Sequence, residues 1–227
     1  SLDTRFLGVS GAGVYDLQAE SRAVILPSAE SVVFEPRSRY AAIPGAGVYD
    51  LVTNPGNRVM RLGENQPIFS PDGRWLAVPG DAVYDVGTWT SAFLLPTSNT
   101  VAFSPNSRYL AVDQGAIYDL ASGQIVFIPQ DSPSDYLFLD DQLIFVSQDG
   151  IYRTDNWRRS VAAPASIEQV HQGHDLIFVG DTLLERGSLA RRIVPFSPYV
   201  VRLDDAVIAV NVGGNCHLYY IVPAVER

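Results

Sequence analysis

A repeat of about 34 residues limits the possible folds of this chain more than any other feature. The first four copies align without gaps, at spacings of 34, 35 and 34 residues: RFLGVSGAGVYD (5–16), RYAAIPGAGVYD (39–50), RWLAVPGDAVYD (74–85) and RYLAVDQGAIYD (108–119). Three degenerate copies keep the phase: QLIFVSQDGIYR (142–153), DLIFVGDTLLER (175–186) and AVIAVNVGGNCHLYY (206–220). Repeats of this length indicate successive copies of one supersecondary unit that packs against its neighbours.

Each copy has the pattern of a β-hairpin, because two short apolar runs flank a turn that usually contains glycine. One further apolar run precedes most hairpins and another follows. The preceding runs are VVF (32–34), IF (68–69), VAF (101–103) and YLF (136–138); the following runs are AVIL (23–26), VMRL (59–62), AFLL (92–95), IVFI (125–128) and RRIV (191–194). Four antiparallel strands per repeat, with no helical pattern between them, predict an all-β chain of four-stranded blades, a β-propeller.

The number of blades follows less directly from the sequence. We predict a single domain over residues 1–227 with seven blades, because seven hairpins can be counted. The alternative is six blades, with residues 199–203 completing the first blade and residues 206–227 forming an appended hairpin.

The stretch FSPNSRYLAV…IYDLASGQ (103–124), with FSPDG (69–73), resembles the WD40-like repeat family and the related FSPDG-type propeller repeats. The resemblance covers roughly residues 5–160 and implies the propeller fold. Tyr stands where that family has the Trp of its signature, no Gly-His pair opens the repeats, and the period is shorter than about 40–45 residues. The resemblance therefore does not extend to the family's structural histidine network.

Oppositely charged residues occupy the two ends of most hairpins. Because the turn lies midway between them, they are predicted to fall nearly opposite each other, where opposite charges stabilise a strand pair. The predicted pairs are Arg5–Asp16, Arg39–Asp50, Arg74–Asp85, Arg108–Asp119 and, with the charges exchanged, Asp175–Arg186. A catalytic or binding role would not survive that exchange, so these residues are predicted to be structural.

If the strands run as in other propellers, the hairpin turns and the links between blades share one face, the acidic face. It would hold nine acids and no Arg: Glu30, Glu64, Asp81, Asp113, Asp131, Asp135, Asp149, Glu168 and Asp181. Such a face could attract a basic peptide, a cationic ligand or a divalent cation. The alternative is that these acids only keep the protein soluble. We treat Asp81, Asp113, Asp149 and Asp181 as candidate partner-binding residues.

The opposite face, formed by the remaining turns, offers other candidates. Trp89 and Trp157 follow the third strand of their repeats, and Arg158 and Arg159 adjoin the second of them. Tryptophan is over-represented at binding hot spots, so these four residues could anchor a partner. The alternative is that both indoles cover the edge of a blade.

No catalytic or metal-binding motif is present, so no catalytic residue, cofactor or metal ligand is predicted. His171 and His174 lie in a turn rather than on a helix face, and Cys216 and His217 are neighbours on a strand and so point to opposite sides. The single cysteine slightly favours the cytoplasm over a secreted location, although a disulfide-free bacterial secreted protein would look the same. The sequence contains no run of 18 or more apolar residues, the length that a membrane-spanning helix needs.

The net charge of −9 and a pI near 4.7 argue against nucleic acid as a partner. We expect a non-enzymatic propeller scaffold that mediates protein–protein interaction as part of a larger protein or complex, with another protein or a basic peptide as its partner. The alternative is a ligand-, cation- or sugar-binding or hydrolytic propeller that uses the acidic face.

Overall fold

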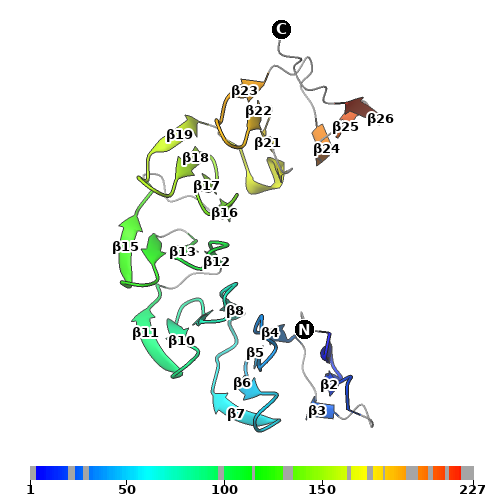
Figure 1. The fold of residues 1–227 in the computed structure, drawn as a ribbon, viewed down its shortest axis with the longest axis vertical. Helices are drawn as coiled ribbons and strands as arrows, with labels where there is room; N and C mark the ends of the chain where they lie inside the picture. The colour runs from blue at the N-terminus through cyan, green and yellow to red at the C-terminus, as the bar shows by residue number, and fades with distance from the viewer. Residues whose placement is uncertain are drawn as a thin grey trace. The chain divides into compact units, whose positions relative to one another are not determined.

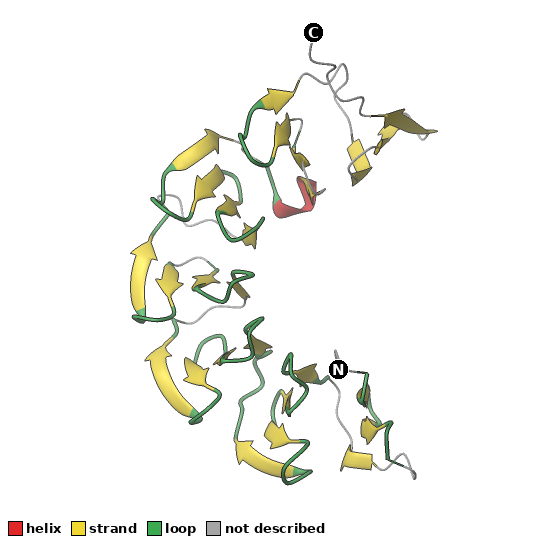
Figure 2. Ribbon diagram, in the orientation of Figure 1, coloured by secondary structure: helices red, strands yellow, loops and turns green. Residues whose placement is uncertain are grey.

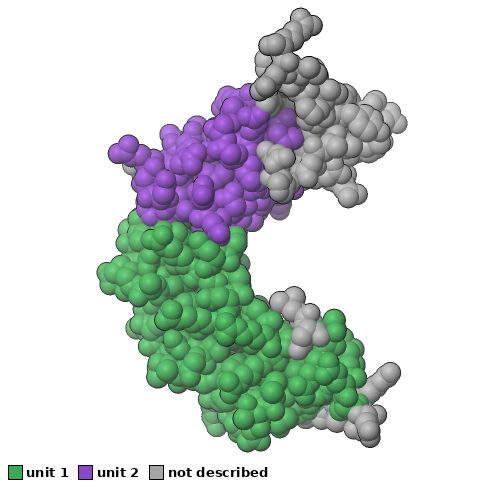
Figure 3. Space-filling view, in the orientation of Figure 1, with its two compact units in different colours: residues 1–128 green, residues 129–227 purple. Residues whose placement is uncertain are grey.

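The computed structural model describes residues 4–19, 24–27, 31–96, 100–113, 116–129, 135–162, 165–172, 176–180, 182–192, 199–203, 207–212 and 215–220, and only their backbone after Arg191. Two compact units make up the chain, Ser1–Ile128 (unit 1) and Pro129–Arg227 (unit 2) (Figure 3). Each unit is described by itself below. That residues 1–227 form a single domain stays a prediction.

The described residues form seven small antiparallel sheets that follow one another along the chain (Figure 1). In unit 1, sheet 1 contains β1 (Phe6–Val9), β2 (Gly13–Asp16) and β3 (Val24–Pro27); sheet 2 contains β4 (Val33–Phe34), β5 (Tyr40–Ile43), β6 (Gly47–Asp50) and β7 (Asn57–Met60); sheet 3 contains β8 (Ile68–Phe69), β9 (Trp75–Ala77), β10 (Ala82–Asp85) and β11 (Thr90–Leu94); sheet 4 contains β12 (Val101–Phe103), β13 (Tyr109–Val112), β14 (Ile117–Asp119) and β15 (Gln124–Phe127).

Unit 2 holds the other three sheets. Sheet 5 contains β16 (Tyr136–Phe138), β17 (Leu143–Val146), β18 (Gly150–Arg153) and β19 (Arg159–Ala162); sheet 6 contains β20 (Val170–Gln172), β21 (Leu176–Val179), β22 (Thr182–Glu185) and β23 (Arg191–Arg192); sheet 7 contains β24 (Tyr199–Leu203), β25 (Val207–Val212) and β26 (Asn215–Tyr220). Figure 2 shows strands joined by loops, with one short 3-10 helix, η1 (Ile167–Gln169), ahead of β20.

The all-β prediction is confirmed, and each of the seven predicted hairpins forms a pair of neighbouring antiparallel strands. Strand order within every sheet follows the chain, as blade-like repeats require. Residues 199–203 pair with β25 and so extend the last hairpin. The six-blade alternative had assigned them to the first sheet.

The core lies between neighbouring sheets. The second strands β5, β13, β17 and β21 are buried at all four positions, because a sheet packed on both faces has no solvent-facing side. One apolar cluster joins sheets 3 and 4, and another joins sheets 5 and 6. The outer strands β7, β11 and β15 are mostly exposed or half-buried. Each sheet thus presents its outer edge and its turns to solvent.

Candidate partner-binding site

Four of the five predicted Arg–Asp pairs lie within the described residues, and the structure brings each of the four together. The N–O distances are 2.9 Å for Arg5–Asp16, 3.6 Å for Arg39–Asp50, 3.9 Å for Arg74–Asp85 and 3.4 Å for Arg108–Asp119. The register agrees with the predicted near-opposite placement, because Asp119 lies opposite Tyr109, the residue next to Arg108. Each Arg precedes its assigned strand by one residue, and its carbonyl oxygen accepts from the N–H of the residue after the Asp.

The guanidinium of each paired Arg also covers the aromatic ring of the next residue. The distances to the ring centroids are 4.7 Å for Arg5 over Phe6, 4.9 Å for Arg39 over Tyr40, 4.7 Å for Arg74 over Trp75 and 4.9 Å for Arg108 over Tyr109. These distances lie within the range of cation–π attraction. The aromatic position of the repeat thus helps to hold the Arg against its Asp.

The Asp of each pair has a second role that the sequence analysis missed: it caps the turn that follows. Asp50 Oδ1 accepts hydrogen bonds from the backbone N–H groups of Val52 (2.8 Å) and Thr53 (2.7 Å). Burial alone would raise the pKa of Asp50, but these N–H groups and Arg39 outweigh it and lower that pKa. The signal was available in DLVTN and DLASG, since Asp ahead of a turn rich in Ser, Thr, Asn and Gly commonly makes this bond.

The sixth copy uses its Arg differently. Asp175 lies outside the described residues, so its pair with Arg186 stays a prediction. Arg186 Nη1 donates to Leu139 O (2.7 Å) and contacts Asp140 Oδ2 (3.1 Å). Both acceptors belong to sheet 5, so this side chain links two neighbouring sheets of unit 2.

The two candidate tryptophans have the same backbone conformation, with φ of +56° in the turn after the third strand. Trp89 is half-buried, and its ring meets Tyr40 of sheet 2 edge to face at 4.8 Å. Trp157 is half-buried as well, and its backbone N–H donates to Arg153 O (2.9 Å). Trp89 therefore packs between sheets 2 and 3. Arg158, the neighbour of Trp157, is exposed.

The predicted separation of acids from arginines fails at Asp149. Its carboxylate accepts from the Arg159 guanidinium and from the Tyr152 hydroxyl, because all three side chains converge on the turn between β17 and β18. Asp81 is exposed and accepts from the Tyr84 hydroxyl (2.8 Å). Burial and this bond raise the pKa of Tyr84 to about 12.

The other candidates of the acidic face are less informative. Asp113 is half-buried, and its N–H donates to Thr100 O (3.1 Å). Asp181, Asp131 and Glu30 lie outside the described residues, as do His174 and the side chain of His171. Within the described part of the chain, no three His, Cys, Asp or Glu side chains are grouped as metal ligands would be.

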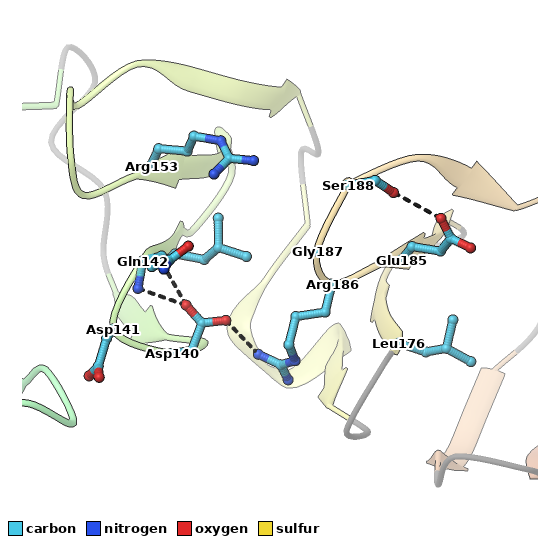
Figure 4. A pocket seen from close by; sticks show the side chains of 10 residues that line it. Asp140, Asp141, Gln142, Arg153, Leu176, Glu185, Arg186, Gly187 and Ser188 are labelled. Atoms are coloured by element: carbon cyan, nitrogen blue, oxygen red, sulfur yellow. Dashed lines mark hydrogen bonds and ion pairs between the residues drawn. The ribbon is translucent and has the colours of Figure 1, made fainter.

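A cleft of about 750 Å³ separates sheets 5 and 6 of unit 2 (Figure 4). It lies at the ends of β17, β18, β21 and β22, away from the hairpin turns. Its lining residues are Asp140, Asp141, Gln142, Leu143, Arg153, Leu176, Glu185, Arg186, Gly187 and Ser188. None of the predicted partner-binding residues is among them, although Arg186 was predicted as a structural residue.

The fifth repeat departs from the pattern of the first four at this cleft. Gln142 and Arg153 stand where the other repeats have the paired Arg and Asp. A different contact closes the hairpin: the Thr154 hydroxyl donates to Asp141 O (2.8 Å). Among the residues that the structure describes, no carboxylate lies within ion-pair distance of the half-buried Arg153, and Figure 4 draws this side chain without a partner.

The other charged side chains of the cleft are bonded to neighbouring groups or point away from Arg153. Asp140 Oδ1 accepts from the N–H groups of Gln142 and Leu143, and Oδ2 contacts Arg186. Glu185 accepts from the Ser188 hydroxyl (2.8 Å). Figure 4 shows Asp141 pointing away from Arg153. Arg153 is therefore the guanidinium of this lining that has no carboxylate of the described residues within ion-pair distance, and the lining also includes the buried Leu143 and Leu176.

A corresponding cleft of about 620 Å³ lies between sheets 2 and 3 of unit 1. Its Arg39 and Arg74 are both paired with Asp residues of their own hairpins, and its Arg37 is exposed. Within the described residues, a half-buried Arg without a nearby carboxylate is thus a feature of the cleft beside the fifth repeat and not of both clefts.

Among the described residues, no helix is long and apolar enough to span a membrane. No protein-family model matches the chain, and no curated protein matches it.

Proposed function

We propose that this protein is a non-enzymatic interaction scaffold, and that a partner protein inserts an acidic side chain into the cleft between sheets 5 and 6. The observation that carries the proposal is Arg153, a half-buried guanidinium that has no carboxylate within ion-pair distance among the residues described by the structure. A partly desolvated cation without a counter-ion costs free energy, and a carboxylate brought by a partner would remove that cost.

The chemistry of the cleft suits a carboxylate on an aliphatic stem. A guanidinium offers two parallel N–H groups to a carboxylate, which makes the contact directional as well as strong. Leu143 and Leu176 provide apolar surface for methylene groups. A volume of about 750 Å³ accommodates a few residues of a peptide but no folded element.

The contacts of the acidic face favour this scaffold over a cation-binding or hydrolytic propeller. Asp149 is balanced by Arg159, and Asp81 is bonded to Tyr84. Asp149 has a guanidinium as counter-ion and is therefore less attractive to a metal cation, and one oxygen of Asp81 is held by a hydroxyl.

The proposal includes a closed ring of seven blades, as in the WD40-like propellers that the repeats resemble. It is supported by seven successive sheets with one strand order and by β24 as the first strand of the last sheet. A closed, compact chain of this length has a radius of gyration of about 17 Å. Small-angle scattering checks this value, and a clearly larger one would contradict closure.

Isothermal titration with a short acetylated and amidated peptide that carries one central Glu between Leu residues tests the binding proposal. Its matched probe has Gln in place of Glu. We expect the Glu peptide to bind the wild type about 10- to 100-fold more tightly than the Gln peptide, the range for a hydrogen-bonded charge pair. Arg153→Gln should abolish this preference.

Arg61→Gln removes an exposed Arg of unit 1 and serves as the control, because it should leave binding unchanged. Equal affinity for the Glu and Gln peptides, or a preference that persists in Arg153→Gln, would contradict the proposal.

A further inference from the structure

The outer edges of sheets 3 and 4 differ from those of sheets 2, 5 and 6, whose outer strands carry Arg, because they carry no charge. β11 and β15 are the last strands of their sheets, and each pairs only with its inner neighbour. One row of backbone N–H and C=O groups on each strand therefore has no partner within its sheet. Residues 86–96 and 120–130, which contain these strands, include no Asp, Glu or Arg.

One position of the outer strand shows the contrast most clearly: the residue that lies opposite the tyrosine of the third strand. This residue is Arg58 in sheet 2 and Arg159 in sheet 5, but Ser91 in sheet 3 and Ile125 in sheet 4. In sheet 1 it is Val24, with Arg22 two residues before it. Charged side chains on an edge strand prevent pairing with another chain, and β11 and β15 lack this protection.

Exposed aliphatic side chains accompany the two uncharged edges. Leu94 is 77% exposed, Ile128 65% and Ile125 49%, the three highest values among the large apolar residues of the described chain. Pro96 and Pro129 follow the two strands and limit their length. The three most exposed large apolar side chains of the described chain thus lie on, or directly after, two short strands that are still able to pair.

The two edges are held by one core within unit 1. The ring of Phe93 in β11 stacks on the ring of Tyr118 in β14, with 5.3 Å between the ring centroids. Sheets 3 and 4 both contribute to the same apolar cluster. Figure 1 shows β11 and β15 as successive arrows that run in the same sense. They therefore form a single surface of fixed geometry.

We infer that two copies of this chain associate through this surface, β11 of one copy pairing with β15 of its partner and the reverse. A twofold axis between the two edges makes both pairs antiparallel and equivalent, so one symmetric interface satisfies both at once. Each chain carries a net charge of −9, so two copies repel each other over most of their surface. The uncharged edges are where two copies can approach. This interface involves unit 1 and is independent of the cleft in unit 2.

The mass of the wild type in solution, measured by sedimentation over a wide range of concentration, tests this inference. We expect a concentration-dependent species of twice the chain mass of 24.8 kDa. The variant Ser91→Arg/Ile125→Arg places Arg where sheets 2 and 5 already have it, so it should fold, and it should remain monomeric. Val52→Arg adds a charge at a turn residue of similar exposure (47%) and should still dimerise.

Hydrogen exchange of the wild type at low and high concentration gives a second measurement that needs no variant. Amides of β11 and β15 should become more protected at high concentration, while those of β7 should not change. A wild type that stays monomeric, a dimer that survives both Arg substitutions, a dimer lost equally in Val52→Arg, or protection elsewhere would each overturn the inference.

Discussion

Asp50 should contribute more to stability as a turn cap than as the partner of Arg39. The residue is 5% exposed, and its Oδ1 accepts two short hydrogen bonds from backbone N–H groups of the turn. Hydrogen bonds to a charged acceptor are worth about 1.5–3 kcal/mol each, but these donors are exposed and water replaces part of the loss. We therefore expect Asp50→Ala to lower the free energy of unfolding by about 2 kcal/mol.

The same reasoning gives a much smaller value for Arg39. Its side chain is 52% exposed and lies 3.6 Å from Asp50, a geometry for which ion pairs contribute about 0.2–1 kcal/mol. Arg39→Gln should therefore cost about 0.5 kcal/mol. Thermal unfolding separates the two variants, because for a chain of this size 1 kcal/mol shifts the Tm by about 2–4 °C.

The pH dependence provides an independent check on Asp50. Its pKa is lower in the folded chain than the ordinary value of 3.8, so the folded state binds fewer protons there. The stabilisation is fully present above that ordinary value and is lost as the pH falls through the folded-state pKa. The stability difference between wild type and Asp50→Ala should shrink accordingly. A loss in Arg39→Gln as large as that in Asp50→Ala would refute the reasoning.

Three further variants test other contacts. A Cβ at Gly73 would lie 2.0 Å from Glu35 Oε1, so Gly73→Ser should destabilise unit 1 in urea unfolding. Glu35→Ser should restore only part of the loss in the double variant, because the φ of +71° at position 73 still disfavours a side chain. Arg186→Gln removes the contacts with sheet 5 and should cost about 1–3 kcal/mol in the same assay. In an ultraviolet titration Tyr84 should ionise near pH 12, and at lower pH in Asp81→Asn, because the repelling carboxylate is gone.

The hairpins could be predicted from the sequence because the same pattern of apolar runs and turns occurs in seven copies along the chain. The aromatic position, filled by Phe6, Tyr40, Trp75 and Tyr109, has the same environment in each of the first four copies. The near-opposite placement of Arg and Asp follows from the symmetry of the hairpin. The contact of each guanidinium with the ring of the next residue does not follow from that symmetry.

The candidate site was missed for the opposite reason. Arg153 stands out in the sequence only because the first four copies have Asp at this position. Such a difference in a degenerate copy does not by itself indicate a binding residue. Nothing in the sequence shows that Thr154 would replace the ion pair and leave Arg153 beside a cleft. It also depends on Arg186 of the neighbouring sheet 6, because Arg186 forms the ion pair with Asp140.

Restoring the common pattern in the fifth repeat tests both roles at once. Gln142→Arg with Arg153→Asp recreates the arrangement of the first four copies, whose pairs span 2.9–3.9 Å. The gain should be limited, because Leu143 stands at the aromatic position and offers no ring to the new Arg. An ion pair and a turn cap together are worth about 1–2 kcal/mol, so the Tm should rise by about 2–8 °C.

The same double variant should lose its preference for the Glu peptide, because Arg at position 142 is then compensated by Asp at position 153. Stability and binding should thus change in opposite directions, the pattern expected when a binding residue replaces a stabilising one. Gln142→Arg alone is the control: it adds a second cation to the cleft and should strengthen binding without adding the turn cap. If the double variant gained no stability, or if it kept the preference, Arg153 could not be the residue that exchanges a structural contact for a partner.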